Sequence, residues 1–290
     1  MTLDSMKPLS VNYHFTRKCN FSCKFCFHTR KSSFVEPIEE AQKALSQLAD
    51  HGMQKLNVCG GEPFLYPDYI GELMTFAKTQ LATKTVSVVT NGSKVTDEWF
   101  QKYAEYVDII AVSCDSFNDE VNRKIGRGAN HVEDVYRIRD LCAKYGVSFK
   151  INTVVCSLNI DEDMNSHIAE LKPCRWKCFQ VLLLDGENTG EKALRDARHL
   201  TISDQNFLDF IDRHKENNCV PEDSSVMMNS YLILDEYLRF LNCTDGNKRP
   251  TGRILDIGVP AALSAAGFDP QRFLQARREF FQDVEDIESF

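Results

Sequence analysis

Hydrophobic and polar residues alternate in two rhythms along this chain. Short runs rich in apolar and β-branched residues predict strands over residues 11–15, 55–58, 85–89, 109–112, 148–154 and 177–184. Between these runs, apolar residues recur at helical spacing, as in the segment 38–48 between Pro37 and Gly52. Strands that alternate with helices indicate a mostly parallel sheet, so we expect an α/β fold, a partial (β/α)6 barrel of the TIM type.

The rhythm changes after about Asp185. Residues 201–214 look helical, and the segment 231–240 is apolar enough to pack under the barrel as a further helix. We therefore expect a barrel over residues 1–200. A C-terminal extension over residues 201–290 should pack on the barrel and close the substrate site.

Composition narrows the class of protein. The hydrophobic share of 43% is ordinary for a globular chain and suffices for a sizeable core. A net charge of −8 argues against a nucleic-acid partner, which usually requires a basic surface. No window approaches 18 consecutive apolar residues and the N-terminus lacks the apolar core of a signal peptide, so we expect no membrane partner. Eleven cysteines, an odd number, suggest reduced thiols and a cytoplasmic location.

Three of the cysteines form the motif C-x-x-x-C-x-x-C directly after the first predicted strand. Cys19, Cys23 and Cys26 therefore lie where the loops of an α/β barrel build active sites. Three thiolates at this spacing can hold a [4Fe–4S] cluster and leave one iron open to a ligand, unlike the four-cysteine clusters of electron carriers. A zinc site completed by His28 is the alternative.

Polar turns follow the next three predicted strands. In Gly60-Gly61-Glu62-Pro63 the glycines permit close approach of the backbone, and the Glu62 carboxylate can receive an ammonium group. Later turns carry Thr90 with Asn91, then Ser113, and each could be a simple turn. Arg127, between two glycines, could pair with a carboxylate or a phosphate.

Polar residues also occur inside the predicted strands. Residues two apart in a strand share a face, and the pairs concerned are Asn12 with His14, Lys150 with Asn152, and Arg175 with Lys177. If these faces and Lys55 point into the barrel, the buried cations need an anionic ligand. The alternative is that they face solvent or pair with nearby acids.

The motifs together resemble the radical SAM superfamily, which uses a [4Fe–4S] cluster and S-adenosyl-L-methionine (SAM), with an aromatic residue, here Phe25, before the last cysteine. A closer resemblance, to viperin-like nucleotide dehydratases, runs from about Pro8 to beyond Gly258. The stretches that carry it are VNYHFTRKCNFSCKFCFHT, GGEPFL, SCDSF, IGRG, FKIN, RWKCFQ and SYLILDEY.

The resemblance implies an antiviral enzyme that converts a nucleoside triphosphate, CTP in vertebrates, to its 3′-deoxy-3′,4′-didehydro form. A 5′-deoxyadenosyl radical would abstract the ribose 4′ hydrogen. An electron donor such as a flavodoxin or reductase, and cytosolic iron–sulfur assembly factors, are the implied protein partners. Two other functions stay open from the residues alone: a radical SAM enzyme that modifies a peptide or RNA, and a non-catalytic metal-binding protein.

The resemblance also implies roles for single residues. The residues at the cluster and SAM would be Cys19, Cys23, Cys26, Phe25, Gly60, Gly61, Glu62, Thr90, Asn91, Ser113 and Arg127. The residues at the nucleotide would be Asn12, His14, Lys55, Lys150, Asn152, Arg175 and Lys177. Tyr231 would stand near the radical chemistry, although a tyrosine in an apolar helix is more often a core residue.

The chain departs from the animal members in several places. We expect no membrane-binding N-terminal helix in it, and Cys59 stands where those proteins have serine. The segment between Gly128 and His131 is shorter, and Phe290 replaces a tryptophan. These differences leave the choice among CTP, UTP and GTP open.

Overall fold

A computed structural model of the chain describes residues 7–227 and 230–267. The strands are β1 Ser10–His14, β2 Lys55–Cys59, β3 Thr85–Thr90, β4 Ile109–Ser113, β5 Ser148–Val155, β6 Arg175–Gln180, β7 Cys219–Glu222, β8 Leu232–Leu234, β9 Arg239–Asn242 and β10 Arg249–Arg253. The α-helices are α1 Ile38–Asp50, α2 Pro67–Thr79, α3 Asp97–Tyr103, α4 Asp119–Ile125, α5 His131–Tyr145, α6 Asn165–Leu171, α7 Asp204–Arg213, α8 Ser224–Met227, α9 Ile254–Ile257 and α10 Val259–Ala265.

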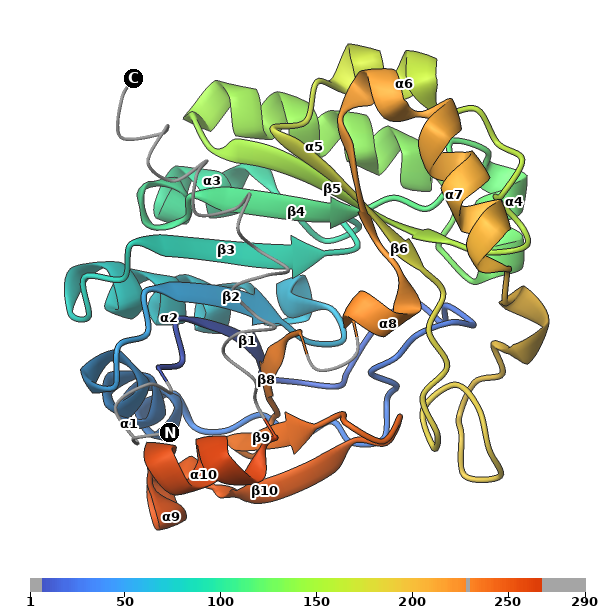
Figure 1. Ribbon diagram of the computed structural model, residues 1–290. Coiled ribbons are helices and arrows are strands. Elements are labelled where there is room, and N and C mark those ends of the chain that lie inside the picture. The colour runs from blue at the N-terminus through green and yellow to red at the C-terminus, as the bar shows by residue number, and fades with distance from the viewer. Residues whose placement is uncertain (1–6, 228–229, 268–290) are drawn as a thin grey trace.

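The strands form one curved sheet in the order β10-β9-β8-β1-β2-β3-β4-β5-β6-β7 (Figure 1). Strands β1 to β6 are parallel neighbours in chain order, with helices in the connections. The later strands extend this unit at both edges, because β7 pairs with β6 and β8 pairs with β1, both in parallel. The expected partial (β/α)6 barrel is confirmed.

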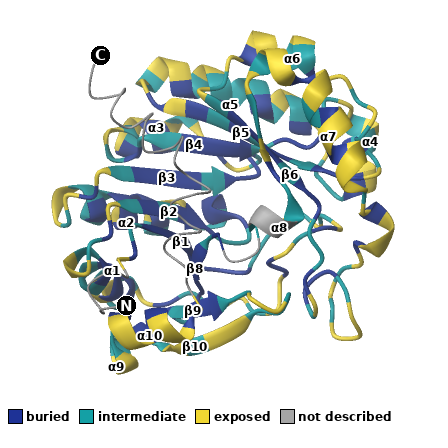
Figure 2. Cartoon of the chain, in the orientation of Figure 1, coloured by how far each residue is buried: buried dark blue, intermediate teal, exposed yellow. Residues whose placement is uncertain are grey.

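The two faces of the sheet differ in chemistry. Leu56 and Val58 of β2 are fully buried in one apolar core with Leu45 of α1, so this face packs against the helices. The alternate residues of the same strand, Lys55 and Asn57, lie on the opposite, inner face and are only partly buried. Figure 2 shows the helices with buried sides toward the sheet and exposed sides outward. The inner face is therefore the polar one.

The apolar segment 231–240 is not a helix, and that expectation was wrong. It forms β8 and the start of β9, an antiparallel pair, with a turn in which the Asp235 carboxylate accepts hydrogen bonds from the backbone N–H groups of Tyr237 and Arg239. A short apolar run fits a buried strand and a buried helix equally well, so periodicity could not decide. Pairing of β8 with β1 decides it.

Strand β6 ends at Gln180, earlier than the sequence predicted. Beyond it, the Asn188 side chain accepts a hydrogen bond from the Leu184 N–H and donates to the carbonyls of Leu182 and Phe25. These bonds turn the chain away from the sheet and toward the cysteine loop. Within the described residues, no helix is both long and apolar enough to span a bilayer.

Candidate active site

The three cysteines lie in an irregular loop that follows β1. Their thiols are free and partly exposed. Across the described residues, no three His, Cys, Asp or Glu side chains converge as ligands of one metal ion would. Zinc needs four ligands around a single ion, whereas a cubane binds each thiolate to a different iron. The His28 ring instead contacts the Lys248 ammonium, at 3.0 Å, and packs on His14 with ring centroids 4.5 Å apart.

The donor set of this loop fits a cluster. Burial raises the pKa of the Cys23 thiol to about 12, so it stays protonated unless cations compensate the thiolate. A backbone N–H already points at one of the sulfur atoms, since Phe21 donates to the Cys19 Sγ at 3.4 Å. Iron ions would supply the missing positive charge.

Two glycine motifs pack directly against the cysteine loop. A Cβ atom on Gly61 would lie 2.1 Å from the Lys18 carbonyl oxygen, and one on Gly60 would lie 2.7 Å from that of Thr16. A Cβ on Gly126 would lie 2.5 Å from the Ser22 carbonyl oxygen. Backbone therefore meets backbone on both sides of the loop, which only glycine permits.

The Glu62 carboxylate joins the glycine motif to the end of β3. Its Oε1 accepts hydrogen bonds from the Thr90 hydroxyl at 2.7 Å and the Phe64 N–H at 2.9 Å, and its Oε2 accepts one from the Asn91 N–H at 2.7 Å. Burial raises the pKa of Glu62, and these three hydrogen bonds oppose that rise. Oε2 has accepted a single bond, so it keeps capacity for another donor.

Asn91 also reaches the cysteine loop, because its amide donates to the Asn20 side chain at 2.9 Å and lies 3.9 Å from the Cys19 sulfur. Phe25 is buried in a small apolar cluster with Ile125 and Val181. The first four strand ends thus bring the predicted SAM residues around one loop.

Arg127 and Ser113 belong to the same region. The Arg127 Nε donates to Asp115 at 2.6 Å, and both side chains are buried. Asp115 therefore offsets much of the positive charge of Arg127, for which the sequence suggested an external carboxylate or phosphate as the partner. Ser113 ends β4, partly buried on the inner face, and its carbonyl accepts a hydrogen bond from the His131 Nε2 at 2.8 Å.

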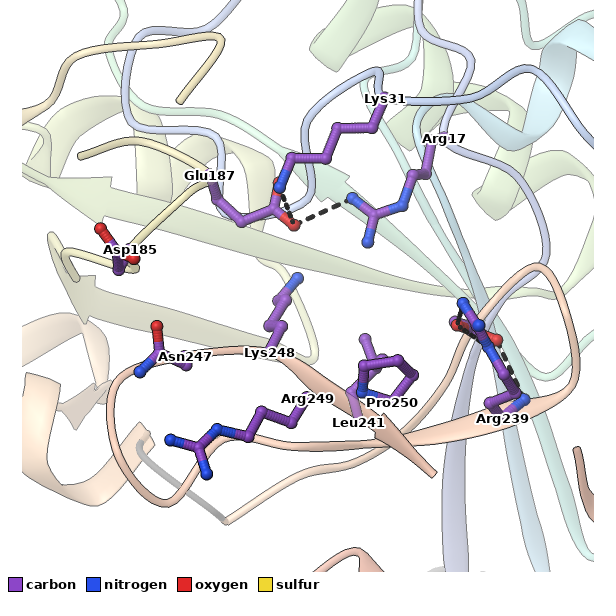
Figure 3. Close-up of a pocket in the computed structure, with 11 residues that line it drawn as sticks. Arg17, Lys31, Asp185, Glu187, Arg239, Leu241, Asn247, Lys248, Arg249 and Pro250 are labelled. Carbon is purple, nitrogen blue, oxygen red and sulfur yellow. Dashed lines mark hydrogen bonds and ion pairs between the residues drawn. The ribbon is translucent and has the colours of Figure 1, made fainter. Parts of the chain in front are cut away.

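A buried ion-pair network closes the far side of the cysteine loop and was not foreseen from the sequence. Arg17, two residues before Cys19, contacts Glu187 and Glu236, each at 3.0 Å. Glu187 in turn accepts hydrogen bonds from the N–H and hydroxyl of Thr29. Figure 3 shows Arg17 and Lys31 both directed at Glu187. Both arms of the loop are therefore fixed to segments far along the chain.

The inner face of β1 to β3 carries a chain of hydrogen-bonded polar groups. The Asn12 side chain accepts a bond from Asn57, which accepts one from Ser87, each 2.9 Å long. His14 is buried, and burial, with the charges of Lys248 and Arg17, holds its pKa well below the usual range. His14 is consequently a neutral residue at this face.

The predicted cations come together on the inner face of β5 and β6. In the register of these strands Lys150 lies opposite Arg175 and Asn152 lies opposite Lys177. Like charges directly opposite destabilise a sheet unless a counter-charge offsets them. Partial desolvation raises the pKa of the Cys174 thiol, although the thiol is exposed, and the positive charges of Lys150, Arg175 and Lys55 oppose that rise, so all three cations lie within electrostatic reach of it.

The inner face of the barrel is long enough to hold an extended ligand. Lys55 begins β2 and Cys59 ends it, so about 13 Å separate the cation end of the barrel from the end that carries the cysteine loop, at roughly 3.3 Å per residue. The buried Oδ1 atom of Asn152, between the two ends, has no hydrogen-bond partner in the described chain. A ligand between the two ends would supply the missing donor.

Glu222, the last residue of β7, is the site residue that the sequence reasoning missed. Its carboxylate accepts hydrogen bonds from the Lys177 ammonium and from the Tyr231 hydroxyl. Lys177 therefore pairs with an acid of the chain, as one of the alternatives left open by the sequence allowed. Tyr231 precedes β8 and is not a helical core residue. No sequence motif marked Glu222, which stands in the short segment Cys-Val-Pro-Glu.

Comparisons with known proteins agree with this geometry. The family profile described as Radical SAM superfamily matches residues 13–171. The S-adenosylmethionine-dependent nucleotide dehydratase RSAD2 of Oncorhynchus mykiss is 52% identical over 98% of this chain and 83% of its own. An S-adenosylmethionine-dependent nucleotide dehydratase of Flammeovirga pacifica is 34% identical over 92% of this chain and 94% of its own.

Solved structures show the same fold at low sequence identity. Streptococcus suis SuiB bound to S-adenosylmethionine aligns with a TM-score of 0.64 and 17% identity, covering 90% of this chain and 68% of that one. The anSMEcpe enzyme with bound AdoMet aligns with a TM-score of 0.62 and 16% identity, covering 82% and 74%. From the profile and the relatives, this chain belongs to the radical SAM superfamily and, within it, to the S-adenosylmethionine-dependent nucleotide dehydratases.

Proposed function

We propose that this chain dehydrates a pyrimidine nucleoside triphosphate, CTP or UTP, to its 3′-deoxy-3′,4′-didehydro analogue. The observation that carries the proposal is the block of cations in register on the inner face, with Lys150 opposite Arg175, while the cysteine loop follows the opposite ends of the strands, about 13 Å away along β2. A triphosphate at this block would place the ribose and base toward the loop. Family membership supports the reaction class, a nucleotide dehydration.

As a radical SAM protein the enzyme uses a [4Fe–4S] cluster and SAM. Cys19, Cys23 and Cys26 would hold the cluster, in a loop that packs on the glycines of the two motifs. The residues that would surround SAM are Phe25, Gly60, Gly61, Glu62, Thr90, Asn91, Ser113 and Arg127. When bound, the two cofactors together supply the carbon radical that removes the ribose 4′ hydrogen.

The residues of the chain would bind and orient the nucleotide and exclude water from the site. Lys55, Lys150, Arg175 and Lys177 would give charge-assisted hydrogen bonds to phosphate oxygens. Asn12, His14 and Asn152 would line the cavity at the sugar, and the neutral His14 would add no charge there. Tyr231 would stand beside the sugar as the donor that ends the radical reaction.

We also infer the cellular context of the reaction. A flavodoxin or reductase would supply electrons to the cluster, and cytosolic iron–sulfur assembly factors would insert it. The reaction would take place in the cytoplasm as part of antiviral defence. The C-terminal extension, residues 201–290, would close the nucleotide site over the barrel of residues 1–200; its last part, 268–290, lies outside the described residues.

The test is turnover by the reconstituted protein under anaerobic reduction, with each of CTP, UTP, GTP and ATP. We expect 5′-deoxyadenosine and the didehydro product to form together with CTP or UTP. SAM cleavage that no nucleotide stimulates would instead favour a radical SAM enzyme that modifies a peptide or RNA. Absence of cleavage with a full iron complement would favour a non-catalytic metal-binding protein.

A further inference from the structure

Glu222 and Tyr231 join the two edges of the parallel sheet. Strand β7 lies at one edge, beside β6, and β8 lies beside β1 at the other side of the unit. Glu222 is the last residue of β7 and Tyr231 immediately precedes β8. Their hydrogen bond therefore spans the seam where the barrel lacks strands (Figure 1).

The Glu222 carboxylate divides its two oxygen atoms between two partners. Oε1 accepts the hydrogen bond from the Lys177 ammonium, and Oε2 accepts the one from the Tyr231 hydroxyl. The Lys177 Nζ also lies 3.4 Å from the Tyr231 hydroxyl. Glu222 is buried. An adjacent cation favours the ionised form of a carboxylate, so the phenol O–H points at a buried base.

If a tyrosine supplies the last electron of the dehydration, the reaction requires such a base beside the phenol. Loss of the 4′ hydrogen atom leaves a carbon radical, and breaking of the C3′–O bond releases hydroxide and leaves a radical cation. One electron then completes the C3′=C4′ double bond, and one proton converts the hydroxide to water. A phenol gives up an electron far more readily when its proton moves to a base in the same step.

We propose that Glu222 is the proton acceptor through which Tyr231 delivers that electron, a role that rests on the proposed dehydratase function. The Tyr231 O–H bond breaks, its electron reduces the substrate radical cation, and its proton moves to Oε2 of Glu222. Glu222 then passes the proton to the hydroxide that leaves from C3′. A one-electron reductant, the protein that also reduces the cluster, restores Tyr231 together with one solvent proton.

The geometry distinguishes this role from direct hydrogen-atom transfer. A phenol that donates its hydrogen to Glu222 cannot at the same time direct that hydrogen at the sugar carbon. Electron and proton therefore leave Tyr231 in different directions. Lys177 contributes as a positioning residue that keeps Glu222 ionised and oriented.

The test compares Glu222→Gln with Tyr231→Phe in the reconstituted holoenzyme. The glutamine keeps an acceptor oxygen and nearly the same volume but is not a base. We expect the ratio of didehydro product to 5′-deoxyadenosine to fall about tenfold or more in each variant, as general-base loss commonly does. The double variant should fall no further than the lower of the two singles, because both remove the same step.

Glu36→Gln is the matched control, since Glu36 is also a buried glutamate paired with a cation, Arg253 at 3.2 Å, away from this seam. Its ratio should equal that of the native protein. Glu222→Asp retains a carboxylate and should recover part of the lost ratio, which also covers the case in which the glutamine variant does not fold. The affinities of all variants for CTP and UTP, measured by calorimetry, show separately whether Lys177 still binds the nucleotide.

Two outcomes would overturn the proposal. One is an unchanged ratio in Glu222→Gln while native protein makes product; if nucleotide binding weakens in that variant, the role of Glu222 is limited to holding Lys177. The other is a ratio in Glu222→Asp as low as in Tyr231→Phe with native stability. Failure of native protein to form product from any nucleoside triphosphate would instead reject the dehydratase function itself.

Discussion

The part of the barrel proposed to hold the cofactors, at the ends of β1 to β4, and the part proposed to bind the nucleotide, on β5 and β6, carry different arrangements of charge; they are called the cofactor half and the nucleotide half below. In the cofactor half, Glu62 accepts three hydrogen bonds and Arg127 pairs with Asp115. In the nucleotide half, Lys150 and Arg175 lie in register on neighbouring strands, where like charges repel.

The two halves therefore differ in the sign of the charge that they gather. The cofactor half is held by short hydrogen bonds and by glycine contacts. The nucleotide half gathers cations on neighbouring strands, which would attract an anion. Lys177, in the nucleotide half, pairs with an acid of the chain, Glu222.

Cys23→Ala should abolish cluster binding in the cofactor half and leave nucleotide binding intact. Two thiolates do not hold the cubane, so the brown colour and SAM cleavage should both be lost. Nucleotide affinity should persist, because the cations lie on strands and not on the cysteine loop. Iron analysis, 5′-deoxyadenosine assay and calorimetry measure the three quantities. Cys142→Ala, on the buried side of α5, is the control that should keep its iron. About four iron atoms per chain with active cleavage in Cys23→Ala would contradict the cluster assignment.

Arg175→Ala should weaken nucleotide binding and leave the cofactor half intact. Truncation of one buried, hydrogen-bonded charge pair costs on the order of 2–4 kcal/mol. Triphosphate binding should therefore weaken roughly thirty-fold to several-hundred-fold, equally for CTP and UTP, since the residue would contact phosphate and not base. Calorimetry with the tri-, di- and unphosphorylated nucleosides provides the measurement. Lys102→Ala, an exposed cation on α3, should bind like native protein. Equal native affinities across each phosphate series would remove the basis for a phosphate site.

His131 should make the stability of the cofactor half depend on pH. Burial lowers its pKa to about 4, and its Nε2 hydrogen bond fixes it behind Ser113. Between pH 6.5 and 4 the unfolded chain binds the proton and the folded chain does not, so the free energy of unfolding falls as the pH falls. The loss reaches about 3 kcal/mol at 1.36 kcal/mol per pKa unit.

His131→Gln should remove that part of the slope when urea unfolding is measured across pH 4–7. His51→Gln, at an exposed position after α1, is the control for a histidine substitution outside the core. A slope in His131→Gln equal to that of native protein would show that His131 titrates normally in the fold.

Gly61→Ala should loosen the cofactor half and leave the nucleotide half intact. The added Cβ would meet the Lys18 carbonyl at 2.1 Å, and overpacking of this kind costs about 1–3 kcal/mol. We expect a lower melting temperature and faster iron loss, with native CTP affinity. Gly146→Ala is the control: its Cβ meets no atom within 4 Å, and its positive φ of 69° costs about 1–2 kcal/mol without touching the loop. Equal iron retention in both variants would show that the glycine contact does not hold the loop.

Local patterns in the sequence determined much of this molecule. The alternation of apolar and polar residues predicted the first five strands almost to their ends, and the spacing of Lys150, Asn152, Arg175 and Lys177 predicted a shared inner face. The cysteine spacing and the glycine motifs predicted a cofactor site after the first strand, and the structure packs these motifs against one another. Each of these features depends on residues a few positions apart, whose side-chain directions follow from strand geometry.

The tertiary structure alone decided the contacts between distant segments. Arg17 meets Glu187 and Glu236 across 170 and 219 residues, and Lys177 meets Glu222 across 45. The apolar segment 231–240 became two strands because β1 offered an unpaired edge to β8. Periodicity encodes only which side of an element is buried, whereas the partner of a buried charge depends on which edges and loops the topology brings together. Glu222 and Tyr231 meet for that reason, at the seam of an incomplete barrel.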